Sequence, residues 1–295
     1  MADFLLREQA PLDATEWERF DSAIVQTARR QLVGRRFLNL VGPLGAGVQE
    51  VPTYVFVGVE PGMLSIVGEE DPKPIKAAER LHPVIPLIYK DFWIYWRDIE
   101  TSRRFGIPLN LSAAAAAAAF VAQREDDLIF NGNADLGYVG LTNVEGRNVL
   151  SKLDWAESGN AFSDAVAAMQ RLVGQGFYGP FVLVVSPTLY ASMARVYANT
   201  GVLEIEQVRK IMTAGIYQTP VLPDDVVLVA SVGPQNFDLV VSQDLVTAYL
   251  TPENLNHAFR VLEAVVLRIH RPGAICTLQA GAPGEERGRP PRRRG

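Results

Sequence analysis

Residues 110–132 read NLSAAAAAAAFVAQREDDLIFNG, and this stretch decides what kind of fold the chain can adopt. Seven consecutive alanines follow two suitable N-cap residues, Asn110 and Ser112, and Gly132 stands where a helix would end. Because alanine has the highest helix propensity, the stretch predicts a long helix. Its alanine half has no bulky side chains, so a sheet or another helix can approach closely, as a central spine requires. We interpret the acidic run 125–127 near its end as a solvated face rather than a metal site.

A second helix is predicted closer to the N-terminus. Asp13 precedes it and Glu16 follows three residues later, which is the spacing of a capping box. Apolar side chains then recur at the helical spacings of three and four: Trp17, Phe20, Ile24, Ala28 and Leu32. After residues 37–41, the glycine-rich stretch 42–47 lacks the GK[ST] of a phosphate-binding loop and any following helical pattern. It predicts a plain turn.

Residues 51–70 predict a hairpin. The β-rich segments 54–59 and 63–67 flank Glu60-Pro61-Gly62, which is a common turn signal. The first segment is apolar on both faces, and both faces therefore need cover. An isolated hairpin is marginal in water, so this one either lies in the chain's own core or is completed by a strand of another chain.

The rest of the chain alternates between helical and strand patterns. The aromatic segment 84–97 predicts core packing and precedes a charged stretch, 97–104. Helices are expected at 161–173, 187–198 and 204–214, with strands at 181–186 and 226–232, as in an inserted α/β unit. β-rich segments return at 237–241, 246–250 and 259–269, and the arginine-rich tail from Gly281 is expected to be disordered. The pattern is that of an α+β protein.

Composition narrows the possible functions. The chain has 28 Lys+Arg against 33 Asp+Glu, a net charge of -5 and a pI near 5.4, which argues against a protein that mainly coats nucleic acid. The single cysteine, Cys276, excludes an intramolecular disulfide and any multi-thiolate zinc site. The N-terminus lacks a secretory pattern, and the apolar run 113–122 is about half of the roughly 20 residues that cross a bilayer. We expect a soluble cytoplasmic protein.

Candidate catalytic chemistry is sparse. The three histidines, His82, His257 and His270, are far apart and lie in no recognised nucleophile or metal motif. Glu79 and His82 match the Glu-x-x-His pair of di-iron helices, but only one copy is present and Pro83 follows at once. These observations predict no catalytic residues and no metal site.

Several segments, taken together and in order, resemble the encapsulins, the shell proteins of bacterial and archaeal nanocompartments. The resemblance covers nearly the whole chain and is closest to the iron-storing myxobacterial members. Segments that carry it are Gly34-Arg35-Arg36-Phe37, Gly42-Pro43, Pro86-Leu87-Ile88, Glu125-Asp126-Asp127-Leu128-Ile129-Phe130, Gly140-Leu141, Gly179-Pro180-Phe181 and Gln243-Asp244-Leu245.

This resemblance implies the fold of the tailed-phage major capsid protein, of the Hong Kong phage type, with a peripheral domain, an axial domain and an extended loop. The hairpin would be the extended loop that pairs with a neighbouring subunit, which favours the second of the two alternatives above. Its expected assembly residues are Tyr54, Val55, Phe56, Val57, Val59, Leu64 and Ile66. The implied divisions are 1–50, the N-terminal helix and start of the peripheral domain; 51–75, the extended loop; 76–137, the peripheral domain with its spine helix; 138–230, the axial domain; 231–280, the returning peripheral strands; and 281–295, the tail.

The resemblance also implies partners. Many copies would form an icosahedral shell around ferritin-like or peroxidase-type cargo that carries a targeting peptide, for iron storage and protection from oxidative stress. The chain itself would bind neither nucleic acid nor membrane, and it would not be an enzyme. Cargo would dock in a groove formed by Ile24, Ala28, Phe37, Asn39, Leu40, Asp244 and Leu245, although Phe37 and Leu40 could equally be ordinary core residues.

Pores and cofactors follow from the same comparison. The five-fold opening is expected at Asn199, Thr200 and Gly201, where a simple turn is equally consistent. No cofactor is required, iron would be handled by the cargo, and a flavin against Trp96 is a weaker expectation. Two other functions remain open: a phage or prophage capsid protein that packages DNA, and a protease or bacteriocin. The acidic chain argues against the first, and the lack of a coherent His, Cys or Ser constellation argues against the second.

Overall fold

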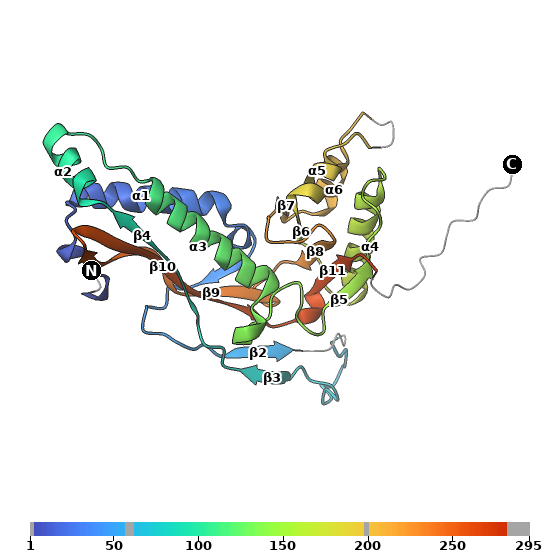
Figure 1. The fold of residues 1–295 in the computed structure, drawn as a ribbon. Coiled ribbons are helices and arrows are strands. Elements are labelled where there is room, and N and C mark those ends of the chain that lie inside the picture. The colour runs from blue at the N-terminus through green and yellow to red at the C-terminus, as the bar shows by residue number, and fades with distance from the viewer. Residues whose placement is uncertain (1–2, 57–61, 198–200, 282–295) are drawn as a thin grey trace. The chain divides into compact units, whose positions relative to one another are not determined.

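The structure is a computed structural model, and it describes residues 3–56, 62–197 and 201–281 (Figure 1). The chain divides into two compact units, each assembled from segments that are distant in the sequence. Unit 1 takes residues 1–56, 77–140 and 237–270, and unit 2 takes 57–76, 141–236 and 271–295. Among the described residues, no helix is both long enough and apolar enough to cross a membrane.

A four-stranded sheet in the order β1-β9-β10-β4 is the framework of unit 1. Its centre is a long antiparallel ribbon of β9 (Phe237–Glu253) and β10 (Asn256–Ile269), so the predicted segments 237–241 and 246–250 form one strand. Irregularities in the register of this ribbon increase its local twist. The short β1 (Asn39–Val41) runs parallel to β9, and β4 (Leu87–Ile94) pairs antiparallel with the free side of β10.

Two helices, α1 (Ala14–Gln31) and α3 (Ser112–Asn131), confirm the two helix predictions. They pack against each other, and α3 also packs on β4 and β10, where its alanines permit a close approach (Figure 1). The predicted capping box is present, since Asp13 Oδ1 accepts the Glu16 N–H at 2.8 Å and Glu16 Oε2 accepts the Asp13 N–H at 2.9 Å. The N-cap of α3 is Leu111, and Asn110 instead accepts the N–H of Ser112.

The segment 84–105 differs from its prediction. Core packing holds for Phe92, which is buried, but Trp93 is 40% exposed because successive side chains of β4 alternate between its two faces. Trp96 is 41% exposed and lies beyond the end of β4. The charged stretch after Trp96 forms a helix, α2 (Trp96–Phe105), that buries only Ile99. Short 3₁₀ turns complete unit 1: Asp3–Leu5, Arg7–Gln9, Gly34–Arg36 and Ala134–Leu136.

Unit 2 is built on a five-stranded mixed sheet in the order β5-β11-β8-β6-β7. Its helices are α4 (Asn160–Gly174), α5 (Pro187–Met193) and α6 (Glu204–Ile211), and a 3₁₀ turn covers Pro272–Ala274. The strands are β5 (Asn148–Ser151), β6 (Phe181–Val185), β7 (Gly215–Gln218), β8 (Val226–Ser231) and β11 (Ile275–Gln279).

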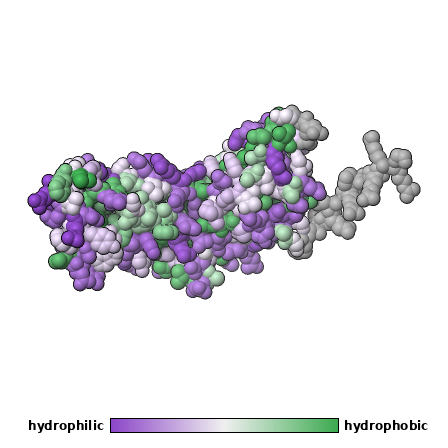
Figure 2. Space-filling view, turned by 45° about the horizontal axis from the view of Figure 1, so that its top comes forward, coloured by the Kyte–Doolittle hydropathy of each residue, from purple (hydrophilic) through white to green (hydrophobic). Residues whose placement is uncertain are grey.

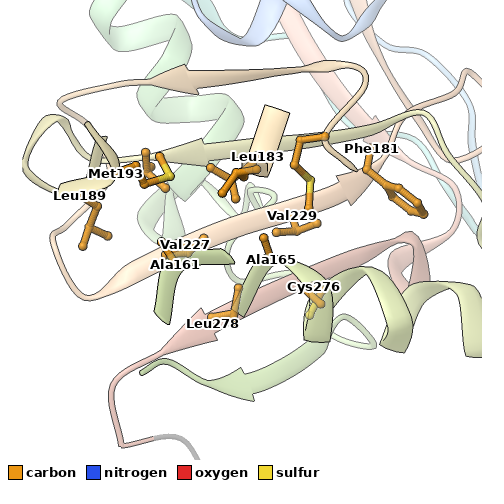
Figure 3. Close-up of a cluster of buried hydrophobic side chains, with 14 of the residues drawn as sticks. Ala161, Ala165, Phe181, Leu183, Leu189, Met193, Val227, Val229, Cys276 and Leu278 are labelled. Carbon is orange, nitrogen blue, oxygen red and sulfur yellow. The ribbon is translucent and has the colours of Figure 1, made fainter. Parts of the chain in front are cut away.

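Residues 271–280, which the resemblance places among the returning peripheral strands, belong instead to unit 2. β11 pairs parallel with β5 and antiparallel with β8, so it lies inside the sheet of unit 2. The cause lies in the core of unit 2, where Cys276 and Leu278 belong to one buried cluster with Val229 of β8 and Leu183 of β6 (Figure 3). Two small residues of α4, Ala161 and Ala165, close the cluster, and the lone cysteine is therefore a buried core residue (Figure 3).

The hairpin is the largest departure from the predicted pairing. β2 (Thr53–Phe56) pairs antiparallel with β3 (Ala77–Leu81), not with 63–67, and the two strands form a separate two-stranded sheet. Residues 63–67 form no strand; Ser65 Oγ accepts the N–H groups of Val67 and Gly68 at 3.3 and 3.2 Å, and the chain bends at 66–67. The strand that pairs with β2 therefore begins at Ala77, farther along the chain than the sequence pattern indicated.

Candidate assembly and cargo-docking surfaces

The extended arm consists of β2, β3 and the loop between them, and its root is fixed to the end of β10. The Phe56 N–H donates to the carbonyl oxygen of His270 at 2.7 Å, and Arg268 Nη1 donates to that of Pro52 at 3.2 Å. Thr53 is buried at this root, whereas Tyr54 is 37% exposed and lies beneath the Arg80 guanidinium. Val55 and Phe56 are half-buried. One end of the arm is thus firmly held within unit 1.

The described part of the loop exposes apolar side chains almost completely. Leu64 and Ile66 are as exposed as in an extended peptide, at 99% and 104%, while Val67 and Ile75 are exposed at 80% and 85%. Single exposed apolar residues are ordinary, but several within one short loop indicate a surface that another molecule covers. Val57 and Val59, also predicted to act in assembly, lie outside the described residues.

β3 offers a second feature suited to pairing between chains. One side of β3 pairs with β2, and among the described strands its other side pairs with none. All five of its residues are exposed. An exposed edge presents backbone N–H and C=O groups to which a further strand can add. Glu79 and His82 lie on and just after this strand, so the Glu-x-x-His spacing does not place them on one helix face.

The two motifs 34–37 and 125–130, which are far apart in sequence, form one structural junction. Asp126 on α3 accepts the N–H of Gly34 at 2.9 Å, and its Oδ2 accepts that of Val33 at 2.9 Å. Burial of this carboxyl raises the pKa of Asp126 to about 7, although these N–H groups favour the ionised form.

Arg35 continues the same junction. It makes a bidentate contact with Glu125 through Nε and Nη2 at 2.8 and 2.7 Å, and it also reaches Glu263 of β10 at 2.8 Å and Asp244 of β9 at 2.7 Å. Burial acts to lower the pKa of Arg35, but the three carboxyls outweigh it and raise this pKa. Burial, and the nearby charge of Glu125, raise the pKa of Glu263 well above its ordinary value. One arginine thereby ties α3, β9 and β10 together.

Packing at the junction is equally close. A Cβ at Gly34 would lie 2.6 Å from Ile129 Cδ1, so glycine is required there by space. The Phe37 and Phe130 rings lie with centroids 6.2 Å apart. The interpretation of 125–127 as a solvated face is therefore wrong for Glu125 and Asp126, which are 0% and 3% exposed. The partners that bury them lie about ninety positions earlier, which no local pattern reveals.

The predicted cargo groove separates into a buried part and an exposed part. Ile24, Ala28 and Phe37 are buried in unit 1, so their side chains are not available to contact cargo. Leu245 is half-buried against the cluster of Ala28, Leu32 and Ala122.

The exposed members of the predicted groove are Asn39, Leu40 and Asp244. Leu40 is 46% exposed, and with Asn39 it lies on β1, an edge strand of the sheet. Asp244 is held by Arg35, and hydrogen bonding to that guanidinium outweighs burial and lowers the pKa of Asp244. It therefore presents a fixed negative charge at neutral pH.

Other predicted sites receive less structural definition. Gly201 lies in an exposed turn with φ of 74°, while Asn199 and Thr200 lie outside the described residues. Trp96 is the first residue of α2; its N–H donates to Asn256 Oδ1 at 3.4 Å, and the Arg97 guanidinium lies 5.9 Å from its ring centroid. Within the described ranges, no group of three or more His, Cys, Asp or Glu residues is arranged to hold a metal.

One polar cluster was not anticipated from the sequence. Asp238 accepts two hydrogen bonds from Arg268, at 2.8 and 2.6 Å, and lies 3.6 Å from His270 Nε2, beside the root of the arm. Local spacing gives no signal for it, since Asp238 lies on β9 whereas Arg268 lies on β10 and His270 directly follows that strand. Alternation along these strands could have placed Arg268 opposite Asp238 only once their register was known.

The mixed polar and apolar character of the surface is visible directly. Figure 2 shows patches of hydrophobic residues set in an otherwise hydrophilic face. Such patches on a chain whose two units each have their own buried core point to contacts with other molecules.

Comparison with known proteins gives these surfaces a context. Residues 2–266 match the model of a family described as "Encapsulating protein for peroxidase". The chain is 48% identical over 287 residues to a type 1 encapsulin shell protein of Myxococcus xanthus, covering 97% of this chain and 100% of that one.

Two fusion proteins are also similar. A diheme-cytochrome-encapsulin shell fusion protein of Kuenenia stuttgartiensis is 43% identical, over 91% of this chain and 74% of its own length. A ferritin-like-encapsulin shell fusion protein of Pyrococcus furiosus is 26% identical, over 70% of this chain and 55% of its own length.

Solved structures share the fold. A virus-like particle protein from Pyrococcus furiosus matches with a TM-score of 0.71 at 22% identity, over 89% of this chain and 99% of that one. The capsid protein of Myoviridae phage XM1 matches with a TM-score of 0.57 at 14% identity, over 82% and 89% of the two chains. The expected tailed-phage capsid fold is confirmed.

Proposed function

Because this chain belongs to the family of encapsulin shell proteins, we propose that many copies of it assemble into a closed icosahedral shell around cargo enzymes. The observation that carries the proposal is the extended arm, whose root is fixed in unit 1 while the apolar loop residues Leu64, Ile66, Val67 and Ile75 are left exposed. Repeating one specific contact around closed symmetry gives a finite particle.

Assembly through the arm explains its unusual composition. Buried apolar area stabilises association, and these side chains are exposed only while the subunit is alone. The free edge of β3 adds a site at which a neighbouring chain can extend the sheet. Several such contacts for each subunit hold a shell together without covalent links.

The cargo we propose is ferritin-like, with iron storage and protection from oxidative stress as the outcome. Support comes from the relative in which a ferritin-like protein and a shell protein are fused in one chain. Docking would use the exposed Leu40 and the half-buried Leu245 as apolar contacts, while Asn39 and Asp244 fix the direction of the bound peptide. Peroxidase-type cargo is the alternative that the family description suggests.

A phage capsid function is less well supported. The phage capsid protein shares the fold at only 14% identity, whereas the encapsulin shell protein is 48% identical over nearly the whole chain. An enzymatic function has no support, since the relatives are named as shell proteins. We place the assembled compartment in the cytoplasm, where the cargo would be synthesised.

No cofactor is needed for this function. A flavin remains a secondary proposal at Trp96, where a half-exposed indole ring could stack against a planar ligand. Absorbance of purified shells near the visible flavin maximum, before and after Trp96→Ala, tests this without reference to any activity.

Electron microscopy and sedimentation of the purified protein test the main proposal. We expect closed particles, and mass spectrometry of native preparations should detect a ferritin-like protein inside them. A well-folded lone subunit that forms no particles at any concentration would refute the shell function. Empty particles from native cells would refute the cargo assignment alone.

A further inference from the structure

The imidazole of His270 lies at the point where the arm meets the sheet. Its Nδ1 is 3.0 Å from the carbonyl oxygen of Tyr54 in β2, and its Nε2 is 3.6 Å from Asp238 Oδ2 in β9. The backbone carbonyl of His270 also accepts the Phe56 N–H. The side chain is 14% exposed, so water competes only weakly for these contacts.

Both ring nitrogens face oxygen atoms, and this determines the protonation state that fits. A carbonyl oxygen can only accept, so Nδ1 must carry a hydrogen to bond with Tyr54. In the neutral ring Nε2 would then present a lone pair towards the Asp238 carboxylate. Only the doubly protonated imidazolium matches both neighbours, with a hydrogen bond on one side and an ion pair on the other.

The other charged groups at this point are few. β9 contributes Asp238 and β10 contributes Arg268, whereas β2 and the residue before it contribute only the backbone oxygens of Tyr54 and Pro52. Asp238 has the largest effect on His270 and raises the pKa of that imidazole, in opposition to burial and to Arg268. Burial acts to raise the pKa of Asp238, but His270 and Arg268 outweigh it and keep this pKa below its ordinary value.

We infer that His270 is a proton-dependent lock that fixes the root of the extended arm to the β9–β10 ribbon, closed when the ring is charged and weakened when the ring is neutral. The lock itself depends only on contacts within unit 1, and its consequence for the shell rests on the proposed function of the arm. Release of a proton would loosen β2 and so change how readily the loop engages a neighbouring subunit.

The direction of the pH dependence follows from linkage. Since the folded state raises the pKa of His270, its stabilising effect is complete below about 6.5, the ordinary imidazole value, and is lost as pH rises through the raised value. Asp238 stays ionised over this range because its pKa is lowered. The arm should therefore be held more firmly at mildly acidic pH than at mildly basic pH.

Hydrogen–deuterium exchange of the purified shells tests the lock. Amides of 53–56 are measured at about pH 6 and about pH 8.5, after correction for intrinsic exchange, and those of α3 serve as the internal reference. One charge-assisted contact is worth enough for an approximately tenfold loss of protection at the higher pH. We expect that loss in the wild type and in the control His82→Gln, whose histidine is exposed on the same arm, but not in His270→Gln.

The outcomes separate the lock from the shell function. An equal loss of protection in His270→Gln would overturn the inference, as would the absence of any loss in the wild type, a measurement that needs no variant. If the pH-dependent loss occurs while the protein forms no particles, the lock stands and the proposed assembly role of the arm fails.

Discussion

Replacing Asp126 tests whether the junction between residues 33–37 and α3 holds unit 1 together. In Asp126→Ala, the buried N–H groups of Val33 and Gly34 lose their acceptor. Each unsatisfied buried donor costs about 1–3 kcal/mol, so the variant should lose about 2–6 kcal/mol of stability. Asp126→Asn should lose much less, because Oδ1 alone lies 3.1 and 2.9 Å from these two nitrogens and can accept from both.

The same carboxyl gives a pH test with a defined sign. The folded state raises the pKa of Asp126 to about 7, so its contribution is complete below the ordinary carboxyl value and is lost as pH rises through about 7. Between about pH 6 and about pH 8, the wild type should lose about 1 kcal/mol through this group. Asp126→Asn cannot ionise, so that part of the loss should be absent.

Thermal unfolding followed by tryptophan fluorescence is a suitable assay, with all variants at one subunit concentration because assembly is linked to stability. A loss of 2 kcal/mol lowers the melting temperature by about 4–8 °C in a protein domain of this size. Asp127→Ala is the matched control, since this neighbouring side chain is 33% exposed and pairs with Arg124 at the surface. Equal melting temperatures for Asp126→Ala and Asp127→Ala would refute the reasoning.

Three further predictions concern packing, assembly and cargo. Gly34→Ala should lower the free energy of unfolding by about 1–3 kcal/mol, because the new Cβ would lie 2.6 Å from Ile129 Cδ1. The control Gly47→Ala should be nearly neutral, because nothing lies within 4 Å of a Cβ there. Equal losses in thermal unfolding would show that space at Gly34 is not limiting. The double variant Leu64→Asp with Ile66→Asp should reduce the yield of particles several-fold in light scattering and microscopy, because burying charged side chains in a subunit contact is costly. The control Glu69→Gln should leave the yield unchanged. An undiminished yield in the double variant would show that the loop is not part of the assembly contact. Leu40→Asp should reduce co-purified cargo about tenfold without loss of particles. The control Leu44→Asp, at an apolar residue of similar exposure in the adjacent turn, should leave the amount of cargo unchanged. Unchanged cargo in Leu40→Asp would place the docking site elsewhere.

Local patterns predicted the helices well, since the signals for a helix lie within a few residues. The capping box at Asp13 and Glu16 and the long alanine helix are both present as expected. The charged helix α2 was missed because only Ile99 of its residues is buried, so that it has almost no apolar stripe. Its single buried residue cannot define a helical period.

Long-range pairing is where the sequence was insufficient. The turn signal at 60–62 suggested a tight hairpin, but β2 pairs with a strand that begins more than twenty residues later. Likewise β11 joins the sheet of unit 2 although it follows two strands of unit 1. Loop-closure entropy grows slowly with length, so distant partners compete with near ones and packing decides between them.

Buried charge explains why the interpretation of 125–127 as a solvated face is wrong for Glu125 and Asp126. An acidic run considered alone is best explained as a solvated face, because burying a carboxylate without partners is costly. The partners exist, however: Arg35 for Glu125, and the N–H groups of residues 33 and 34 for Asp126. The two motifs are thus the two halves of one buried contact, and a change to either half leaves polar groups of the other unsatisfied.

Two sets of buried polar contacts, one at the junction and one at the root of the arm, are attached to the same β9–β10 ribbon. Arg35 ties α3, β9 and β10 together, and Asp238, Arg268 and His270 hold the arm at the end of the same β9–β10 ribbon. A contact between subunits has a defined geometry only if the surface that makes it is fixed to its own core. The buried polar contacts therefore fix β2 to the β9–β10 ribbon, so that the root of the arm is a rigid part of unit 1.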